Sequence, residues 1–246
     1  MVRKVRRNTD KRIFVSKEIN FGRLSKREKQ QLVTEVNVLR SLDHPNVVCY
    51  EDRIIDQPSS KLHIIMEYCA RGDLGTWLRE EKKKMEFVGE DIIWKIAYQV
   101  LLALDYCHSR VADPKGRGGK VIHRDIKPAN IFISEMNSIK LGDFGLSREM
   151  GEHSEFAETH VGTPYYMSPE QVKSAPYNEK SDIWSTGIIL YELAALKRPF
   201  EANNQLNLAR KIESGRFDRI PFRYSENLFS LICSMLVVDP DRRPSK

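Results

Sequence analysis

The feature that most constrains this chain is a pair of polar segments that lie close together in the sequence. The first reads His-Arg-Asp-Ile-Lys-Pro-Ala-Asn over residues 123–130, and the second reads Asp-Phe-Gly over residues 143–145. Short β-branched and apolar runs at 121–122, 131–133 and 139–141 are typical of strands. The sequence therefore predicts short strands that bracket both polar segments.

The strand predicted at residues 14–19 carries a lysine on an apolar face. Side chains alternate along a strand, so Ile13, Val15 and Lys17 share one side. Taken alone, Lys17 would be interpreted as an exposed strand lysine, so its meaning depends on the rest of the pattern.

A helix is predicted after this strand. Ser25 and Glu28 form a capping box, and the Asp-His-Pro at 43–45 ends the helix. Glu35 borders the apolar stripe instead of opposing it. The stripe consists of Leu32, Val36 and Leu39.

The other expected elements divide the chain into two parts. Strands at 47–55 and 62–68 complete a strand-rich first part. Helices at 92–108 and 181–195 dominate the rest, and the second is apolar nearly all round, which predicts burial. A strand-rich part joined to a helix-rich part predicts two lobes with a ligand cleft between them.

The residue types in the polar segments suit phosphoryl transfer. The segments match the catalytic-loop pattern H-R-D-x-x-x-x-N and the D-F-G pattern at the expected interval. Asp143 and Asn130 offer the oxygen ligands that Mg²⁺ requires. Asp125 is placed to accept a proton from a substrate hydroxyl, and Lys127 can hold the transferring phosphate. Each motif alone would be a weak signal, but their order behind the upstream lysine and glutamate argues against coincidence.

The whole chain resembles the eukaryotic protein kinase fold. Several segments are similar to the NIMA-related kinase family: residues 65–69, 156–170, 176–185 and 219–225. The resemblance implies one α+β protein kinase domain over 1–246, with a small β-rich lobe at 1–68 and a large helical lobe with the hinge at 69–246. It implies a serine/threonine protein kinase that uses ATP and Mg²⁺ and acts on protein substrates.

The resemblance also implies a nucleotide site between the lobes. Lys17 would pair with the α- and β-phosphates while Glu35 holds it in place, and Asn130 and Asp143 would bind Mg²⁺. The residues expected to contact the nucleotide are Val2, Val15, Lys17, Met66, Glu67, Cys69, Phe132, Asn130 and Asp143.

Further roles are implied for residues around the catalytic loop. Thr163 would form a hydrogen bond near Asp125 and Lys127. Thr159 is expected to be phosphorylated in activation, with Arg124 pairing with the phosphate. Ser154 is a weaker candidate, and Thr159 could also be an ordinary loop threonine.

Three internal contacts are also expected from the resemblance. Asp182 would brace the catalytic loop, and Glu170 would pair with Arg243. A stack through the two lobes would contain Tyr50, Leu39, Phe144 and His123.

The chain departs from the kinase pattern at its ends. The Gly-rich loop G-x-G-x-x-G-x-V is absent, and Val2 falls on its final valine. We expect that loop and the first strand upstream of Met1, and a last helix after Lys246, in a longer protein. The alternative is a non-catalytic, kinase-like interaction module.

The composition argues against several other classes of protein. The net charge of +6 could indicate nucleic-acid binding, but basic and acidic residues are mixed along the chain, so no nucleic-acid partner is expected. Four scattered cysteines without a C-x-x-C pair indicate reduced thiols in an intracellular, cytoplasmic protein. No apolar run suggests a signal peptide or membrane partner. The family resemblance also implies the centrosome, the cytoskeleton or the nucleus as locations, and a role linked to the cell cycle or the cytoskeleton.

Overall fold

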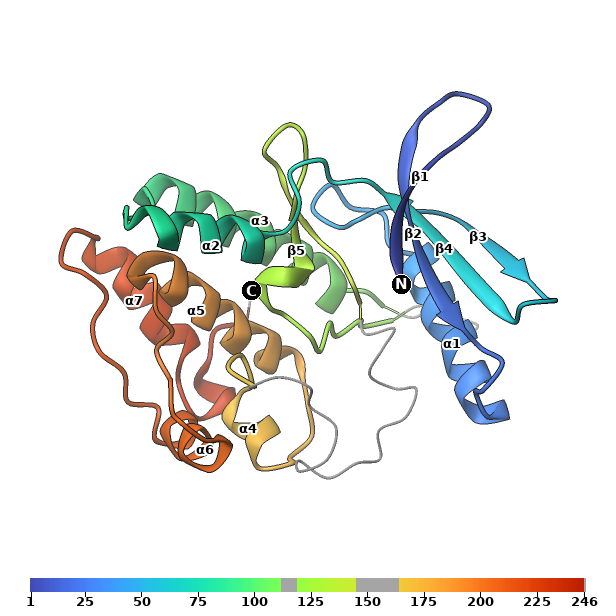
Figure 1. Cartoon of the computed structure of the whole chain (residues 1–246). Helices are drawn as coiled ribbons and strands as arrows, with labels where there is room; N and C mark the ends of the chain where they lie inside the picture. Colours follow the sequence, from blue (N-terminus) through green and yellow to red (C-terminus); the bar gives the residue numbers. More distant parts are fainter. Residues whose placement is uncertain (112–118, 145–163, 246) are drawn as a thin grey trace.

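The computed structural model describes residues 1–111, 119–144 and 164–245. It has the expected α+β architecture, with a small lobe built on an antiparallel sheet and a large helical lobe (Figure 1). None of the helices that it describes is both long and apolar enough to span a membrane.

The small lobe is a four-stranded antiparallel sheet with one helix against it. The strand order is β1-β2-β4-β3, so β2 and β4 are interior strands. The elements are β1 (Val2–Arg6), β2 (Ile13–Asn20), α1 (Lys26–Arg40), β3 (Tyr50–Asp56) and β4 (Lys61–Glu67).

Helix α1 begins and packs as its sequence predicts. The Ser25 side chain accepts a hydrogen bond from Glu28 N, and the Glu28 side chain accepts one from Ser25 N at 2.6 Å. The three residues of the predicted apolar stripe are the buried residues of the helix. The capping box therefore fixes where α1 starts, and the stripe fixes which face meets the sheet.

The strand predicted from residue 47 begins three residues later, at Tyr50. The backbone before it is committed to the large lobe: Val48 N donates to Leu141 O at 2.8 Å, and Leu141 N donates to Asn46 O at 2.8 Å. Because the Val48 N–H and the Asn46 C=O are bonded to Leu141 of the large lobe, these residues join the lobes instead of extending the small-lobe sheet.

The large lobe is built around α5 (Glu179–Ala195), whose residues 181–194 are all buried as predicted. Helix α7 (Glu226–Met235) packs so closely on it that a Cβ at Gly187 would lie 2.8 Å from Met235 Cβ. The other elements are α2 (Leu74–Lys84), α3 (Glu90–His108), the 3₁₀ turn η1 (Pro128–Asn130), β5 (Ile131–Ile133), β6 (Ile139–Leu141), α4 (Pro169–Val172), α6 (Gln205–Ser214) and η2 (Pro240–Arg242).

The predicted ion pair between Glu170 and Arg243 is confirmed. Two parallel bonds of 2.7 Å join Arg243 Nη1 and Nη2 to the Glu170 carboxylate. Both side chains are buried, and Ser181 Oγ donates to the same carboxylate at 2.6 Å. Burial alone would raise the pKa of Glu170, but the hydrogen bonds from Arg243 and Ser181 bring it below its ordinary value.

Candidate active site

Two side chains of the catalytic loop converge on Asp125. Lys127 Nζ donates to Asp125 Oδ2 at 2.7 Å. Asn130 Nδ2 donates to Asp125 O at 2.8 Å and to Asp125 Oδ2 at 3.0 Å. The structure therefore brings together the predicted proton acceptor, the predicted phosphate-binding lysine and one predicted metal ligand.

A buried aspartate holds the backbone of this loop, as expected. Asp182 Oδ2 accepts from His123 N at 3.0 Å, and Asp182 Oδ1 accepts from Arg124 N at 3.1 Å. Arg124 has a left-handed backbone with φ 69°, which is unfavourable for a non-glycine residue and therefore needs such support.

Two further side chains, not foreseen from the sequence, complete the Asp182 brace. His108 Nε2 lies 2.8 Å from Asp182 Oδ2, and Tyr177 Oη donates to Asp182 Oδ1 at 2.6 Å. Burial would raise the pKa of Asp182, but the bond to His108 and the nearby imidazoles lower it below its ordinary value. Asp182 is thus an ionised, fully buried anchor for the catalytic loop.

The second polar segment lies against the first through His123. His123 Nε2 is 2.9 Å from Gly142 O, and its ring centroid is 4.6 Å from that of Phe144. Gly142 N also donates to Asn130 O at 3.0 Å. These contacts place Asp143 beside the catalytic loop, and they include two members of the expected stack.

Lys17 differs from its expected pairing. It forms an ion pair with Asp143 Oδ1, and Glu35 is not its partner among the described ion pairs. The Lys17 side chain is 15% exposed, and a largely buried ammonium group requires a nearby anion. Asp143 supplies that anion, so Lys17 links the small lobe to the D-F-G segment. Glu35 lies on α1 with both carboxylate oxygens buried.

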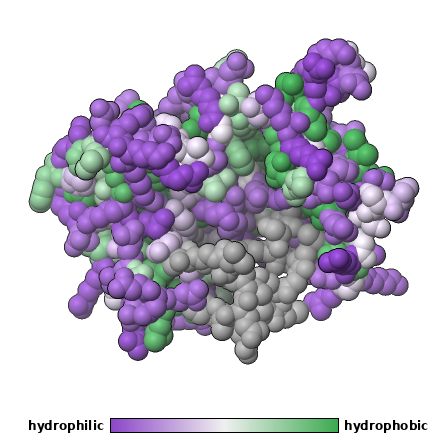
Figure 2. Space-filling view, viewed as in Figure 1, coloured by the Kyte–Doolittle hydropathy of each residue, from purple (hydrophilic) through white to green (hydrophobic). Residues whose placement is uncertain are grey.

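A cavity of about 230 Å³ lies between the lobes, next to Lys17 and Asp143. Its lining includes the six residues predicted to surround the nucleotide ring: Val2, Val15, Met66, Glu67, Cys69 and Phe132. In the space-filling view, hydrophobic residues gather where the small lobe meets the large lobe (Figure 2). An apolar slot with a few polar groups at one end suits a flat ring that carries a charged tail.

The cavity also has lining residues that sequence reasoning missed. Val48 is one of them, and it packs closely on Gly142: a Cβ at Gly142 would lie 2.8 Å from Val48 Cγ2 and 3.0 Å from Phe132. Asp73 lines the cavity while capping α2, where it accepts from Thr76 N at 2.8 Å. Only the helix-capping pattern of Asp73 was visible in the sequence.

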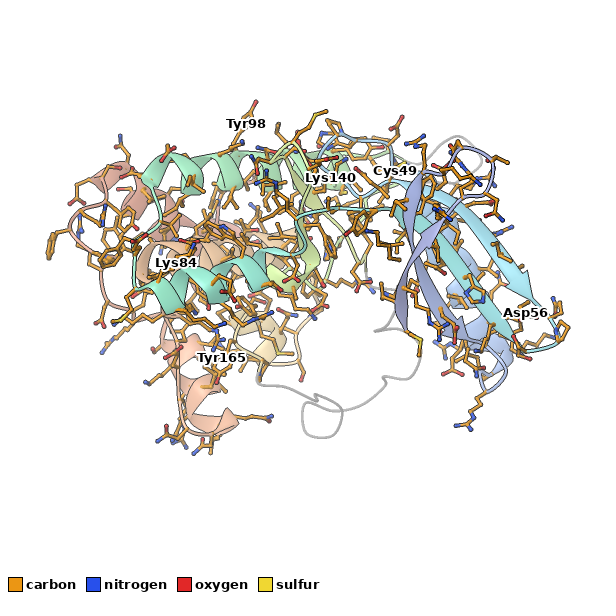
Figure 3. The ribbon with its side chains drawn as sticks, turned by 45° about the horizontal axis from the view of Figure 1, so that its top comes forward. Cys49, Asp56, Lys84, Tyr98, Lys140 and Tyr165 are labelled. Carbon is orange, nitrogen blue, oxygen red and sulfur yellow. The ribbon has the colours of Figure 1, made fainter. Side chains whose placement is uncertain are left out.

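Glu67 and Cys69 line the cavity in different ways. The Glu67 carboxylate accepts from Cys49 N at 3.2 Å and pairs with Lys140 Nζ at 2.9 Å. Cys49 and Lys140 lie at the junction of the lobes, far from Asp56 at the tip of the small lobe (Figure 3). Burial raises the pKa of the Cys69 thiol to about 11, so it is a neutral lining group.

The donor set fits Mg²⁺ held mainly by its nucleotide. The Asn130 amide nitrogen is committed to Asp125, so its oxygen is the atom available for a metal, and Asp143 adds a carboxylate. Within the described ranges, no group of three or more His, Cys, Asp or Glu residues forms a metal cage. One carboxylate and one amide, completed by phosphate oxygens, is the usual way in which Mg²⁺ binds.

Two predicted site residues, Thr159 and Thr163, lie outside the described residues. The other predicted regulatory residue, Arg124, lies in the catalytic loop next to Asp125 and is exposed.

Comparison with known proteins agrees with this geometry. The family model described as protein kinase domain matches residues 1–246. Serine/threonine-protein kinase Nek2 of Mus musculus is 50% identical over 242 residues, 98% of this chain and 54% of that protein. Probable serine/threonine-protein kinase nek2 of Dictyostelium discoideum is 48% identical over 245 residues, 100% of this chain and 57% of that protein. G2-specific protein kinase nimA of Emericella nidulans is 42% identical over 262 residues, 99% of this chain and 37% of that protein.

The chain therefore belongs to the protein kinase domain family. Its similarity to the Nek2 and NimA proteins, at up to 50% identity, confirms the NIMA-related resemblance. The chain spans about half the length of the Nek2 relatives that it matches.

Proposed function

We propose that this protein is a serine/threonine protein kinase that transfers the γ-phosphate of Mg·ATP to hydroxyl groups of protein substrates. The observation that carries the proposal is the Asp125 cluster beside the interlobe cavity, with Lys127 and Asn130 on one carboxylate oxygen. This arrangement supports a positioned proton acceptor next to a phosphate-binding cation.

The proposed nucleotide site uses the lining of the interlobe cavity. Val2, Val15 and Phe132 would pack on the adenine ring, while backbone groups of Glu67 and Cys69 would bind its edge. Lys17 would move from Asp143 to the α- and β-phosphates, with Glu35 as the partner that orients it. Magnesium, when bound by Asp143 and Asn130, neutralises charge on the phosphate oxygens.

In the proposed transfer, Asp125 accepts the proton of the attacking hydroxyl at its carboxylate. Lys127, now 2.7 Å from that carboxylate, would hold the transferring phosphate as negative charge gathers on it. The Asp182 brace fixes the loop backbone so that neither group must reorganise during the reaction.

Selectivity for serine and threonine is proposed from two sequence features. Lys127 is followed by Pro128, and Thr163 lies in a Gly-Thr-Pro segment; both are similar to serine/threonine kinases and unlike tyrosine kinases. We further propose that phosphorylation of Thr159, with Arg124 as the cation that pairs with the phosphate, activates the enzyme.

The names of the relatives suggest a cellular role for this protein. NimA of Emericella nidulans is called a G2-specific protein kinase, which supports a cell-cycle role in an intracellular compartment for this protein. The partners in that role would be protein substrates and ATP.

Phospho-amino-acid analysis tests the proposal. The purified chain, Mg·ATP and a mixed Ser/Thr/Tyr substrate such as casein should give phosphoserine and phosphothreonine without phosphotyrosine. Phosphotyrosine as the main product would contradict the serine/threonine assignment. A Lys127→Ala variant, which keeps the cavity lining, is expected to bind nucleotide but lose transfer.

A further inference from the structure

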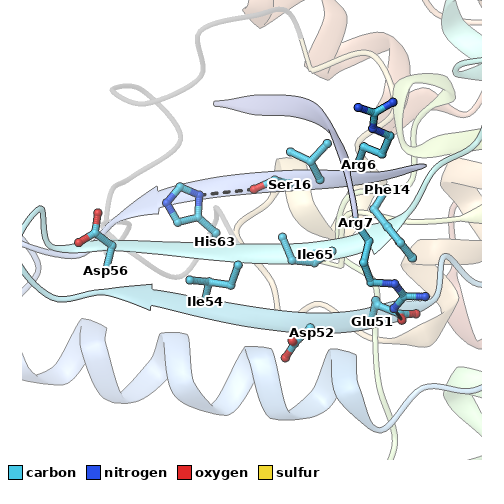
Figure 4. A pocket seen from close by; sticks show the side chains of 11 residues that line it. Arg6, Arg7, Phe14, Ser16, Glu51, Asp52, Ile54, Asp56, His63 and Ile65 are labelled. Carbon is cyan, nitrogen blue, oxygen red and sulfur yellow. Dashed lines mark hydrogen bonds and ion pairs between the residues drawn. The ribbon is translucent and has the colours of Figure 1, made fainter. Parts of the chain in front are cut away.

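A groove of about 710 Å³ lies on the outer face of the small-lobe sheet (Figure 4). Side-chain alternation along β2 separates it from the nucleotide site: Phe14 and Ser16 line the groove, whereas Val15 and Lys17 line the interlobe cavity. Helix α1 covers the opposite face of the sheet (Figure 4). Among the described residues, no element covers the groove.

The floor of the groove is more apolar than an exposed sheet face should be. Outward positions of a one-sided antiparallel sheet are normally polar. Here Val5, Phe14, Ile54 and Ile65, one from each strand, line the groove, and Ile54 is 56% exposed. Phe14 is buried, but Val5 and Ile65 are partly exposed beside Ile54, and apolar surface left exposed on three strands of one sheet face is a mark of an interaction site.

One end of the groove is closed by an internal ion pair. Arg7 Nη1 donates to Glu51 Oε1 at 2.5 Å, and the Arg7 guanidinium lies 4.8 Å from the Phe14 ring centroid. Arg7 also bonds Asp10 in the turn of the hairpin. These contacts tie the β1–β2 hairpin to β3 and give the groove a fixed wall.

The charges that remain along the groove are divided between its two sides. Arg6 lies on the hairpin side, and Asp52 and Asp56 lie on the β3 side (Figure 4). None of the three forms an ion pair with a described residue. A partner that matches both sides must therefore carry acidic groups along one flank and basic groups along the other.

The backbone of the sheet decides what shape this partner has. Strands β2 and β4 are interior, so their N–H and C=O groups are used within the sheet and cannot bind an extended peptide laid across the face. A helix needs no such bonds because it satisfies its own backbone. From β2 to β3 the floor spans two strand spacings, about 10 Å, which is also about the diameter of a helix with its side chains.

We propose that the outer groove is a docking site for an amphipathic helix of a protein partner, with an apolar stripe between an acidic flank and a basic flank. The stripe would cover Ile54 and Ile65, the acidic flank would face Arg6, and the basic flank would face Asp52 and Asp56. Since the groove lies on the sheet face opposite to the nucleotide cavity, docking leaves the catalytic residues accessible.

The test uses two labelled helical probe peptides of about 20 residues, a length that supports helix formation. Both have the same leucine stripe and the same numbers of Glu and Lys. In the split probe all Glu lie on one flank and all Lys on the other; in the mixed probe both residues alternate on both flanks. Fluorescence anisotropy with the whole chain should show about tenfold tighter binding of the split probe, since two matched flanks add two ion pairs.

Protein variants then identify the groove. Ile54→Asn should weaken both probes about tenfold, because it removes apolar burial. Ile55→Asn is the matched control: Ile55 is the next residue in β3 and is 51% exposed, but it lies against α1 on the other face. That variant should bind both probes as the parent chain does.

Charge variants test the flanks. Arg6→Glu makes both sides acidic and should abolish the preference for the split probe. The triple variant that adds Asp52→Arg and Asp56→Arg should restore it, because both sides are then reversed in charge and the probe can bind with its direction reversed. Equal affinity of the two probes for the parent chain, no binding of either below about 1 mM, or equal effects of Ile54→Asn and Ile55→Asn would each overturn the proposal.

Discussion

Lys17 of β2 and Asp143 of the D-F-G segment form an ion pair across the interlobe cavity. The Lys17 side chain is 15% exposed and that of Asp143 is 37% exposed, so the pair is partly screened by water. It couples the predicted phosphate-binding cation to the predicted metal ligand. Binding of phosphate by Lys17, or of a metal ion by Asp143, must therefore compete with this ion pair.

We predict that Lys17→Met has opposite effects on metal and nucleotide. Removing the lysine releases the Asp143 carboxylate, so Mn²⁺ alone should bind about fivefold more tightly, as expected for loss of one partly exposed ion pair. ATP should bind more weakly because its phosphates lose a cation. Manganese electron paramagnetic resonance and nucleotide titration measure the two affinities. A fall in the affinities for both Mn²⁺ and ATP would show that the Lys17–Asp143 ion pair does not weaken metal binding.

The Asp182 brace should control the rate of transfer more than nucleotide binding. We predict that Asp182→Asn lowers kcat about 100-fold, because the buried anion that fixes His123 N and Arg124 N is lost, while KM for ATP changes little. Tyr177→Phe removes one bond to Asp182 and should have a smaller effect. Steady-state kinetics on both variants measure this, and a change confined to KM would contradict the role of the brace.

The buried pair of Glu170 and Arg243 should stabilise the large lobe. We predict that Arg243→Met lowers the free energy of unfolding by about 3–5 kcal/mol, since it leaves the Glu170 carboxylate buried and unpaired. Replacing both residues with Met and Leu should cost less than the sum of the single changes. Urea unfolding of the four proteins measures the coupling, and additive costs would contradict it.

The same pair should make stability depend on acid pH. The pKa of Glu170 in the folded state lies below its ordinary value of 4.5. Its contribution is therefore complete above pH 4.5 and is lost as the pH falls through the lower folded value. The stability difference between the parent chain and Glu170→Gln should shrink over that range, as urea midpoints would measure. A difference that grows as the pH falls would contradict the sign.

Activation should depend on Thr159. We predict that Thr159→Ala prevents the rise in activity that follows treatment with an activating kinase, because Arg124 then lacks the phosphate. Ser154→Ala, in the same segment, is the control and should respond as the parent chain does. Retention of full activation by Thr159→Ala would assign the modification elsewhere.

Much of the site was predictable because its chemistry lies in short, ordered motifs. The spacing of the H-R-D and D-F-G patterns identified Asp125, Asn130 and Asp143, and the structure brings these residues together. The capping box at Ser25 and the apolar stripe of α1 were local patterns, so they also gave the correct element. Apolarity all round the 181–195 segment correctly predicted a central buried helix.

What the sequence did not reveal depends on contacts between distant segments. The strand predicted from residue 47 was placed too early because residues 46–48 bond to β6, which local periodicity cannot show. The ion pair of Lys17 with Asp143 was likewise not foreseen, since two carboxylates compete for one cation and local sequence does not show which of them lies nearer. His108 and Tyr177 were missed because nothing in their own neighbourhood points to Asp182.

The measurement that tests the central claim most directly is transfer of radiolabelled γ-phosphate from Mg·ATP to casein by this chain and by Asp143→Ala. The kinase assignment predicts transfer by the parent chain and at most a trace by the variant. Asp125→Asn, which keeps the size of the proton acceptor but removes its basicity, should be equally inactive. Equal transfer by the parent chain and both variants, or none by any of them even after the upstream glycine loop of a relative is added, would contradict the assignment.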